Sequence, residues 1–460
     1  MTANTRESAT SHTSINSDIQ ERMQQLLTEL QLDDAPAGGA LVVYQAGVCI
    51  AQAAVGMAQT DLAWQPDTLA INFSTGKGVL ATLVHVLVSQ QLLDYDTAIA
   101  SYWPDFSAKG KADITLRMVM SHRADLFSIN SIDTHNTAGS DALRDWQLML
   151  QKVAVMPITP PEDAHSYDSA YSALVYGWVL GGVIEAVTKM SLAQALRQYL
   201  TEPLSIADSC YFGVPSAKVA DVARLAKNFA PTSSVAQPSR RRRKPVLKVD
   251  SQQTLETYAH LPTYQCWMQH TDHNRANSEQ TEASVHNDSQ TLLDTAQINR
   301  LYFDSSQLNL RNYKAALIPN NEQPIDYYNE QTLQAVIPAA NGVASAQALA
   351  TIYAMLANGG VWQGKTLIDA ATFEQLSTVQ VTGQDAVMPA DMQWRLGYHK
   401  LLSVCTDAGT GFGHMGYNGS VAWCDPARQL SFAFIHNFDI TMLNDVRQFA
   451  LTESLLALID

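Results

Sequence analysis

The sequence predicts an α+β fold, in which an antiparallel β-sheet flanked by terminal helices packs beside a mainly helical domain. Both ends of the chain carry a helix pattern next to strand patterns, whereas the middle carries apolar helices. At 460 residues and 46% hydrophobic content, the chain is long enough for two domains or more. We expect a disordered N-terminus over 1–15, a sheet domain built from 16–72 and 335–460, and a helical domain over 73–334.

The N-terminal part of the expected sheet domain begins with a helix. Ser17-Asp18-Ile19-Gln20 resembles a capping box, and apolar residues then recur at helical spacing. Two strands are expected near 40–44 and 48–55, joined by a turn at Gln45-Ala46-Gly47. This end of the chain therefore supplies a helix and a β-hairpin.

The C-terminal part has the reverse order. A strand from Leu430 to His436 follows a turn at 425–428. The last helix is expected from about Asp445, with Asn444 as its cap. Because strands come from both ends, we expect the two ends to meet in one antiparallel sheet.

The segment from about 230 to 306 departs from this pattern, because it is polar and has no extended apolar period. Such a segment is typical of a flexible lid or a disordered insertion. Its basic run, Arg240 to Lys244, is interpreted as a solvated loop, with binding to an anionic surface as the alternative. No metal and no other cofactor is expected, since ligand spacing is lacking in the cluster of Cys266, His270, His273 and His286.

The charge and composition exclude several classes of partner. Lys and Arg number 29 against 44 Asp and Glu, which gives a net charge of −15 and makes nucleic acid a poor partner. Apolar runs such as 173–184 are too short to span a membrane, and residues 1–14 lack a signal core. Five cysteines without framework spacing predict free thiols and a cytoplasmic location. The oligomeric state is left open.

The first motif with chemical meaning is Ser74-Thr75-Gly76-Lys77, which opens an apolar helix expected over 75–93. Residues three apart share a helix face, so the Lys77 amine is expected beside the Ser74 hydroxyl. Burial and the helix N-terminus both disfavour an ammonium ion, so Lys77 is a candidate base for a Ser74 nucleophile. A structural ion pair of Lys77 is the alternative.

The second motif is Tyr167-Asp168-Ser169, in a loop ahead of an apolar helix expected over 174–187. A loop in this position presents side chains to a cleft. A phenol near a lysine can relay protons between nucleophile and leaving group, which makes Tyr167 a candidate for that role. Plain packing of Tyr167 is the alternative.

The third motif runs from Gly413 to Ser420 and includes His414-Met415-Gly416-Tyr417. Glycines at 411, 413, 416 and 419, ahead of a hairpin, indicate an edge strand where the backbone approaches something closely. A backbone N–H at this edge could serve an oxyanion. A glycine-rich strand entry with a satisfied histidine is the alternative.

In this order, the three motifs resemble those of the serine β-lactamase and penicillin-binding-protein superfamily, closest to its class C-like branch of esterases and peptidases. Further stretches are similar to segments of that family: Ile114 to His122, Glu202-Pro203-Leu204, and Ile337 to Ser345. The resemblance covers roughly residues 38 to 225 and 330 to 440. It implies a β-lactamase/transpeptidase-like fold with the active site in a cleft between the two domains.

The resemblance also implies roles for single residues. Ser74 would be the acylated nucleophile, Lys77 its general base and Tyr167 a second proton-transfer group. The backbone N–H groups of Ser74 and Tyr417 would form the oxyanion hole, which suits acyl transfer. His414 would take the place of the family's cationic lysine.

Three departures from the family pattern bear on the substrate, which Ser169, His414 and Gly416 are expected to contact. Ser169 replaces an asparagine that helps to hold a substrate amide, and His414 is only partly charged near neutral pH. Ala124-Asp125 stands where the family usually has Ser-Gly. The first two argue against a dedicated β-lactamase.

The leading hypothesis is therefore a serine hydrolase that forms an acyl-enzyme on Ser74, a carboxylesterase acting on short-chain esters. Its partner would be a small-molecule ester or amide. One alternative is a β-lactamase or a D-amino acid peptidase. An alternative of another class is a catalytically silent β-lactamase-like binding protein.

Overall fold

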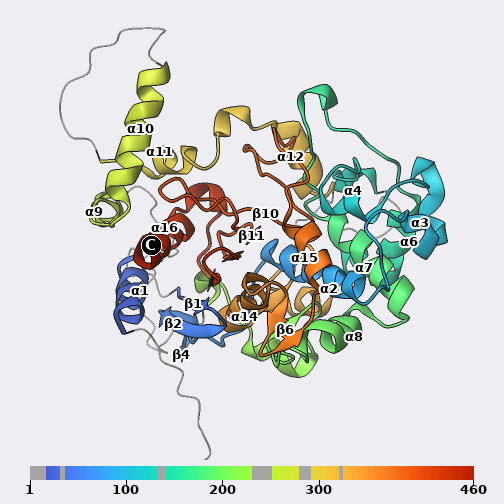
Figure 1. The fold of residues 1–460 in the computed structure, drawn as a ribbon, viewed down its shortest axis with the longest axis horizontal. Coiled ribbons are helices and arrows are strands. Elements are labelled where there is room, and N and C mark those ends of the chain that lie inside the picture. The colour runs from blue at the N-terminus through green and yellow to red at the C-terminus, as the bar shows by residue number, and fades with distance from the viewer. Residues whose placement is uncertain (1–16, 32–36, 133–140, 230–250, 279–291, 321–324) are drawn as a thin grey trace, which may run out of the picture.

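The computed structural model describes residues 17–31, 37–132, 141–229, 251–278, 292–320 and 325–460 (Figure 1). The expectations for the N-terminus at 1–15, for the basic run at 240–244 and for His286 lie outside these residues.

A six-stranded antiparallel sheet forms one half of the molecule, in the order β10-β11-β12-β13-β1-β2. The strand β1 lies between β2 and β13, so the two ends of the chain meet there, with Val42 opposite Ala433. The predicted α+β fold class is thereby confirmed. The bounds are Gly39–Gln45 for β1, Val48–Val55 for β2, His399–Lys400 for β10, Phe412–Met415 for β11, Val421–Asp425 for β12 and Leu430–His436 for β13.

Helices cover both faces of this sheet (Figure 1). Successive side chains of a strand point to opposite faces. In β1, Ala40 and Val42 belong to the core shared with α14 and the helical half, whereas Leu41 and Val43 belong to a second core with α1 and α16. Both faces are therefore buried, which explains the unbroken apolar run of the strand. These helices are α1 Ser17–Glu29, α14 Ala346–Ala357 and α16 Arg447–Ile459.

Local turn and capping chemistry sets the ends of these elements. Ala46 and Gly47 both have positive φ, of 49° and 76°, as a tight two-residue hairpin requires. The last helix starts at Arg447, two residues later than predicted, and Asn444 is not its cap. Instead, the buried Asp445 carboxylate accepts from the Arg447 backbone and forms an ion pair with its guanidinium at 2.6 Å.

The other half of the molecule is mainly helical and is built around α2 Thr75–Ser89 and α7 Val175–Thr188. These two apolar helices contact each other, and their buried residues extend around the whole circumference. Smaller helices surround them (Figure 1). They are α3 Ile99–Tyr102, α4 Leu116–Met120, α5 Asp141–Arg144, α6 Trp146–Val155, α8 Leu192–Leu196, α12 Leu310–Leu317, α13 Glu330–Gln334 and α15 Ala370–Ser377.

Three smaller sheets accompany the main sheet among the described residues. A three-stranded sheet of order β5-β7-β6 lies directly before the first motif, and two further pairs, β3 with β4 and β8 with β9, form small ribbons. Their bounds are Met57–Gln59 for β3, Leu62–Ala63 for β4, Ala70–Ile71 for β5, Cys210–Tyr211 for β6, Val343–Ala344 for β7, Val361–Trp362 for β8 and Lys365–Thr366 for β9.

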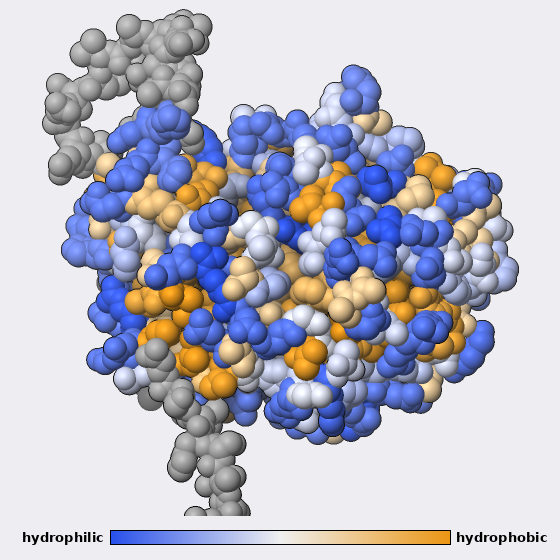
Figure 2. Space-filling model, in the orientation of Figure 1, coloured by the Kyte–Doolittle hydropathy of each residue, from blue (hydrophilic) through white to orange (hydrophobic). Residues whose placement is uncertain are grey.

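Within the described ranges, no single helix is long and apolar enough to cross a membrane. The pair 175–188 and 192–201 reaches the required length only when taken together, and it is bent by 77°. Figure 2 shows hydrophilic side chains spread over one face of the molecule, with hydrophobic areas between them.

The segment expected to be a flexible insertion contains three helices that lie beside α16 on the sheet side (Figure 1). The Trp267 side chain is fully buried, and its Nε1 donates to Tyr302 Oη at 2.9 Å. Tyr302 Oη in turn donates to Glu453 of α16 at 2.7 Å. The expectation was therefore wrong for these residues, because a few aromatic anchors fix an otherwise polar segment. The helices are α9 Gln252–Ala259, α10 Tyr264–Ser278 and α11 Thr295–Arg300.

The prediction of five free thiols was also wrong. Cys266 of α10 forms a disulfide with Cys405, which lies 139 residues later in the chain. Cys266 is therefore no metal ligand, and the described residues contain no other cluster suited to a metal ion. The cytoplasmic location rested on free thiols, so it stays a prediction without that argument.

Truncation of Trp267 tests whether α9 to α11 belong to the cooperative core. We expect Trp267→Ala to lower the free energy of unfolding by about 3 to 5 kcal/mol, the usual cost of removing a buried tryptophan. Denaturant unfolding of the purified protein measures this. His273→Ala, on the exposed side of the same helix, is the matched control and should change little. Equal stability of both variants would contradict the packing described above.

Candidate active site

The structure brings the side chains of Ser74 and Lys77 into contact at the start of α2. Lys77 Nζ donates to Ser74 Oγ at 2.8 Å and to the Ala339 carbonyl at 2.8 Å. The lysine side chain is completely buried, whereas Ser74 lines two cavities. The Ser74 hydroxyl thus faces a cavity and accepts a hydrogen bond from the Lys77 amine. This is the geometry of an activated nucleophile.

The buried amine has no anionic partner among the described residues, and the alternative of a structural ion pair has no support. Burial lowers the pKa of Lys77 well below its ordinary value of 10.5, because an ammonium ion loses its hydration there. The neutral amine is therefore available at lower pH than in water. A neutral amine at this distance can accept the Ser74 proton.

The chain turns sharply immediately before the serine. Phe73 has φ of 48°, in the left-handed region that side chains other than glycine rarely adopt. It links β5 to α2 and places Ser74 at the helix N-cap position. Strained backbone of this kind is concentrated at functional sites.

Tyr171 is the phenol that lies beside the Ser74 and Lys77 pair. Lys77 Nζ lies 5.1 Å from the centre of the Tyr171 ring. Ser74 and Tyr171 both line the smaller cavity, and the Ser74 side chain is close enough to favour the ionised phenol. The ring also stacks on Trp394, with centroids 5.5 Å apart. Burial raises the pKa of Tyr171 above its ordinary value of 10.0, so the phenol keeps its proton at neutral pH.

The second motif predicted this phenol at Tyr167, whereas the structure has Tyr171 beside Ser74 and Lys77. The Tyr167 hydroxyl instead accepts from Asn309 Nδ2 at 3.5 Å. The segment is held away because Asp168 N donates to the Gln384 carbonyl at 2.9 Å. Tyr171-Ser172-Ala173, four residues later and directly ahead of α7, stands where Tyr167-Asp168-Ser169 was expected.

Ser169 was expected to contact substrate, but its side chain is buried and lines neither cavity at Ser74. Its Oγ donates to Asp385 Oδ2 at 2.7 Å. The same carboxylate accepts from Trp394 Nε1 at 3.0 Å and from the Tyr171 backbone at 3.3 Å. Ser169 thus contributes indirectly, because it hydrogen-bonds the Asp385 carboxylate that in turn binds Tyr171 and Trp394.

His414, on β11, is only 2% exposed and lines the smaller cavity with Ser74. Its Nδ1 lies 2.9 Å from the Met415 carbonyl, which can only accept, so Nδ1 carries the hydrogen. Its Nε2 has no partner among the described residues. Burial lowers the pKa of His414 well below 6.5, helped by the nearby His399 and Lys77. The ring is therefore neutral, not partly charged as expected.

Gly416 and Tyr417 bring the end of β11 close to the nucleophile. A Cβ at Gly416 would lie 2.5 Å from the Asn72 carbonyl, so only glycine permits this approach. Within the described chain, neither the Ser74 nor the Tyr417 amide donates to a protein acceptor. Both residues line the cavities. Two free amides at a nucleophile are the donors that an oxyanion hole needs.

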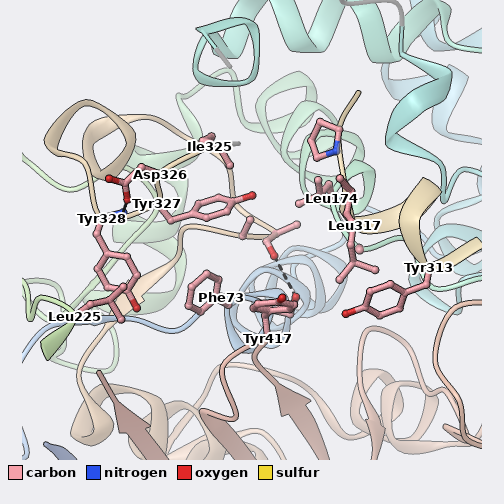
Figure 3. A pocket seen from close by; sticks show the side chains of 16 residues that line it. Phe73, Leu174, Leu225, Tyr313, Leu317, Ile325, Asp326, Tyr327, Tyr328 and Tyr417 are labelled. Carbon is pink, nitrogen blue, oxygen red and sulfur yellow. Dashed lines mark hydrogen bonds between the residues drawn. The ribbon is translucent and has the colours of Figure 1, made fainter. Parts of the chain in front are cut away.

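A cavity of about 570 Å³ opens at Ser74. In Figure 3, Phe73, Tyr327 and Tyr328 lie on one side, and Leu317 and Tyr313 on the other. Its other described walls are also mostly apolar, and they include one ionisable carboxylate, Asp326, but no lysine or arginine. The cavity therefore suits an uncharged, apolar group attached to the carbonyl that Ser74 attacks.

Comparisons with known proteins agree with this geometry. The family model described as Beta-lactamase matches residues 16–455. The esterase/beta-lactamase LipL of Mycobacterium tuberculosis is 30% identical over 407 residues, which span 87% of this chain and 77% of LipL.

Solved structures show the same fold. A penicillin-binding protein homologue from Caulobacter crescentus has a TM-score of 0.70 at 24% identity, covering 96% of this chain and 98% of that one. A family VIII carboxylesterase has a TM-score of 0.66 at 22% identity, with 96% and 98% covered.

The reactivity of Ser74 is testable with a fluorophosphonate. We expect covalent labelling of the parent protein, detected by intact mass, and none of Ser74→Ala. The labelling rate should rise with pH as Lys77 loses its proton, with a midpoint below 10.5 because burial lowers the pKa of the amine. Lys77→Arg should label very slowly, since a guanidinium keeps its proton. Labelling of this variant at the parent rate would place the base elsewhere.

Proposed function

This chain belongs to the β-lactamase family, and from that premise we propose that it is a carboxylesterase whose Ser74 forms an acyl-enzyme. The observation that carries the proposal is the grouping of Ser74, Lys77 and Tyr171 beside a large apolar cavity whose described walls contain no lysine or arginine. The resemblance read from the motifs is confirmed at the level of the family. The name of LipL includes both an esterase and a β-lactamase, which supports hydrolysis of an acyl bond here.

Acylation follows from the protonation states at the site. The neutral Lys77 amine accepts the Ser74 proton while Oγ attacks the ester carbonyl, and the Ser74 and Tyr417 amides hold the oxyanion. Tyr171, which keeps its proton, donates it to the leaving alkoxide. The Lys77 ammonium then returns a proton to Tyr171, which leaves the acyl-enzyme with both groups in their starting states.

An ester is favoured over a β-lactam because the site has no cation for a carboxylate. His414 is neutral, and the described walls of both cavities contain no lysine or arginine. The carboxylate of Asp326 in the larger cavity would repel an anionic substrate. Turnover of a β-lactam or a D-amino acid amide is the second candidate. It would use the same Ser74 nucleophile, but the residues that line the cavities do not favour it.

The cavity also bears on the size of the substrate. Short-chain esters remain substrates in this proposal, but about 570 Å³ of mainly apolar space is more than an acetyl group fills. Burying each additional methylene contributes about 0.8 kcal/mol. The acyl or alcohol part is therefore expected to extend beyond acetate.

The two tyrosines allow a matched test of the site. We expect Tyr171→Phe to lower kcat for p-nitrophenyl butyrate by about 100-fold or more, as loss of a general acid does. Tyr167→Phe, which removes the same hydroxyl four residues away, should retain kcat within about twofold, because among the described residues its phenol bonds only to Asn309. Steady-state kinetics on both variants decide the assignment. The reverse result would restore Tyr167 as the catalytic phenol.

Substrate class is tested by comparing p-nitrophenyl acetate, butyrate and octanoate with nitrocefin. We expect kcat/KM to be much higher for the esters, with butyrate or octanoate above acetate. Because burial lowers the pKa of His414 well below 6.5, the ring stays neutral from pH 6 to pH 8. The ratio of ester to nitrocefin turnover should therefore stay constant over that range. Preferential nitrocefin hydrolysis would contradict the proposal, and the absence of any acylation would favour a silent binding protein.

A further inference from the structure

A second, much smaller chamber lies beside Ser74, with a volume of about 20 Å³. Its described walls are largely methionine and aromatic side chains. The hydroxyl and imidazole side chains among them are Ser74, Tyr171, Tyr417, His399 and His414. The chamber is far too small for an acyl chain, so it has another use than the large cavity.

The two histidines of the chamber differ in whether a ring nitrogen remains without a hydrogen-bond partner. His399 uses both nitrogens, since Nδ1 donates to the Lys400 carbonyl at 2.6 Å and Nε2 accepts from Met415 N at 3.0 Å. His414 uses only Nδ1, so its Nε2 is a buried lone pair without a partner in the described chain. A buried acceptor without a partner costs about 1 to 3 kcal/mol. Its retention calls for a donor that the protein itself does not supply.

A water molecule fits both the size and the chemistry of this chamber. About 10 to 15 Å³ is enough for one water, which also needs two to four polar partners. Ser74 Oγ, the Tyr171 hydroxyl and His414 Nε2 provide three. We propose that this chamber holds the water that hydrolyses the acyl-enzyme, and that His414 Nε2 orients it by accepting one of its O–H groups. This inference rests on the acyl-enzyme proposed above.

The hydrolytic step balances with the groups at the site. The water oxygen forms a bond to the acyl carbon while one of its protons passes to Tyr171, whose own proton passes to the Lys77 amine. The bond from the acyl carbon to Ser74 Oγ then breaks, and Lys77 returns the proton to Oγ. The products are the free carboxylic acid and the starting serine. Throughout, the second O–H of the water points to His414, which makes His414 a positioning residue.

A charged lysine at this position could not do the same, because an ammonium group has donors and no acceptor. The replacement of a lysine by a neutral histidine thus exchanges a carboxylate-binding group for a water-orienting one. The expected consequence is selective: acylation is independent of His414, whereas deacylation depends on it.

Pre-steady-state kinetics separate the two steps. The parent and His414→Leu, His414→Lys and His414→Gln are mixed with p-nitrophenyl butyrate, and acylated Ser74 is followed by intact mass. We expect His414→Leu and His414→Lys to give a burst near one equivalent of p-nitrophenol, followed by deacylation slowed about tenfold or more. His414→Gln, whose amide oxygen is an acceptor, should recover much of the deacylation rate.

His436→Leu is the matched control, because His436 is also buried on β13 and lines neither cavity. Its Nε2 also has no hydrogen-bond partner among the described residues, with Asp445 Oδ2 3.9 Å away. It should show the parent ratio of acylation to deacylation. Folded His414→Leu or His414→Lys that deacylates at the parent rate would overturn the inference, as would His414→Gln as slow as His414→Lys. Should His414→Leu not fold, the lysine and glutamine variants decide. A parent protein that never acylates would instead overturn the proposed function.

Discussion

The proposed active site depends on one unfavourable arrangement, a lysine amine that is buried without a counter-ion among the described residues. Lys77 has only the Ser74 hydroxyl and the Ala339 carbonyl as hydrogen-bond partners in the described chain. A buried ammonium is far less stable than a buried amine, so the fold itself sets the protonation state of the base. The groups around it follow the same rule. Burial keeps the His122 and His414 rings uncharged and the Tyr171 phenol protonated.

The fold maintains this arrangement by closing the site from both halves of the molecule. Lys77 and Ser74 come from the central helix α2, whereas His414 comes from the sheet strand β11. The two elements meet where Gly416 approaches the Asn72 carbonyl, directly before the serine. Asp385 then fixes Tyr171 and Trp394 from a third segment. Because each wall belongs to a different part of the chain, the site exists only in the complete fold.

The sequence predicted what local geometry determines. The contact of Ser74 with Lys77 needs only a helical turn, and the sheet built from both termini follows from strand patterns at each end. The sequence pointed to Tyr167 as the phenol beside Ser74, whereas the structure has Tyr171 there. The choice between two tyrosines four residues apart depends on the pairing of Asp168 with Gln384, more than 200 residues away. A signal was present, since Tyr171 is the tyrosine next to the apolar helix.

Long-range partners also explain the other errors. The disulfide of Cys266 joins residues 139 positions apart, so no local spacing of cysteines predicts it. The polar segment around it folds because Trp267 and Tyr302 reach Glu453 of the last helix. Composition averages over such anchors, so a polar segment with two or three buried aromatic residues has the same signature as a disordered one.

The two cavities at Ser74 differ in size and polarity, which suits one of them to a substrate group and the other to a water molecule. The larger one is mainly apolar and open to a substrate group, whereas the smaller one is water-sized and ends on the free nitrogen of His414. A hydrolase needs both, because an acyl-enzyme is useful only if water reaches the carbonyl in the right orientation. A neutral histidine in place of a cation fits this division, because His414 brings no positive charge to the site and, in the role proposed above, gives the smaller cavity an acceptor for water.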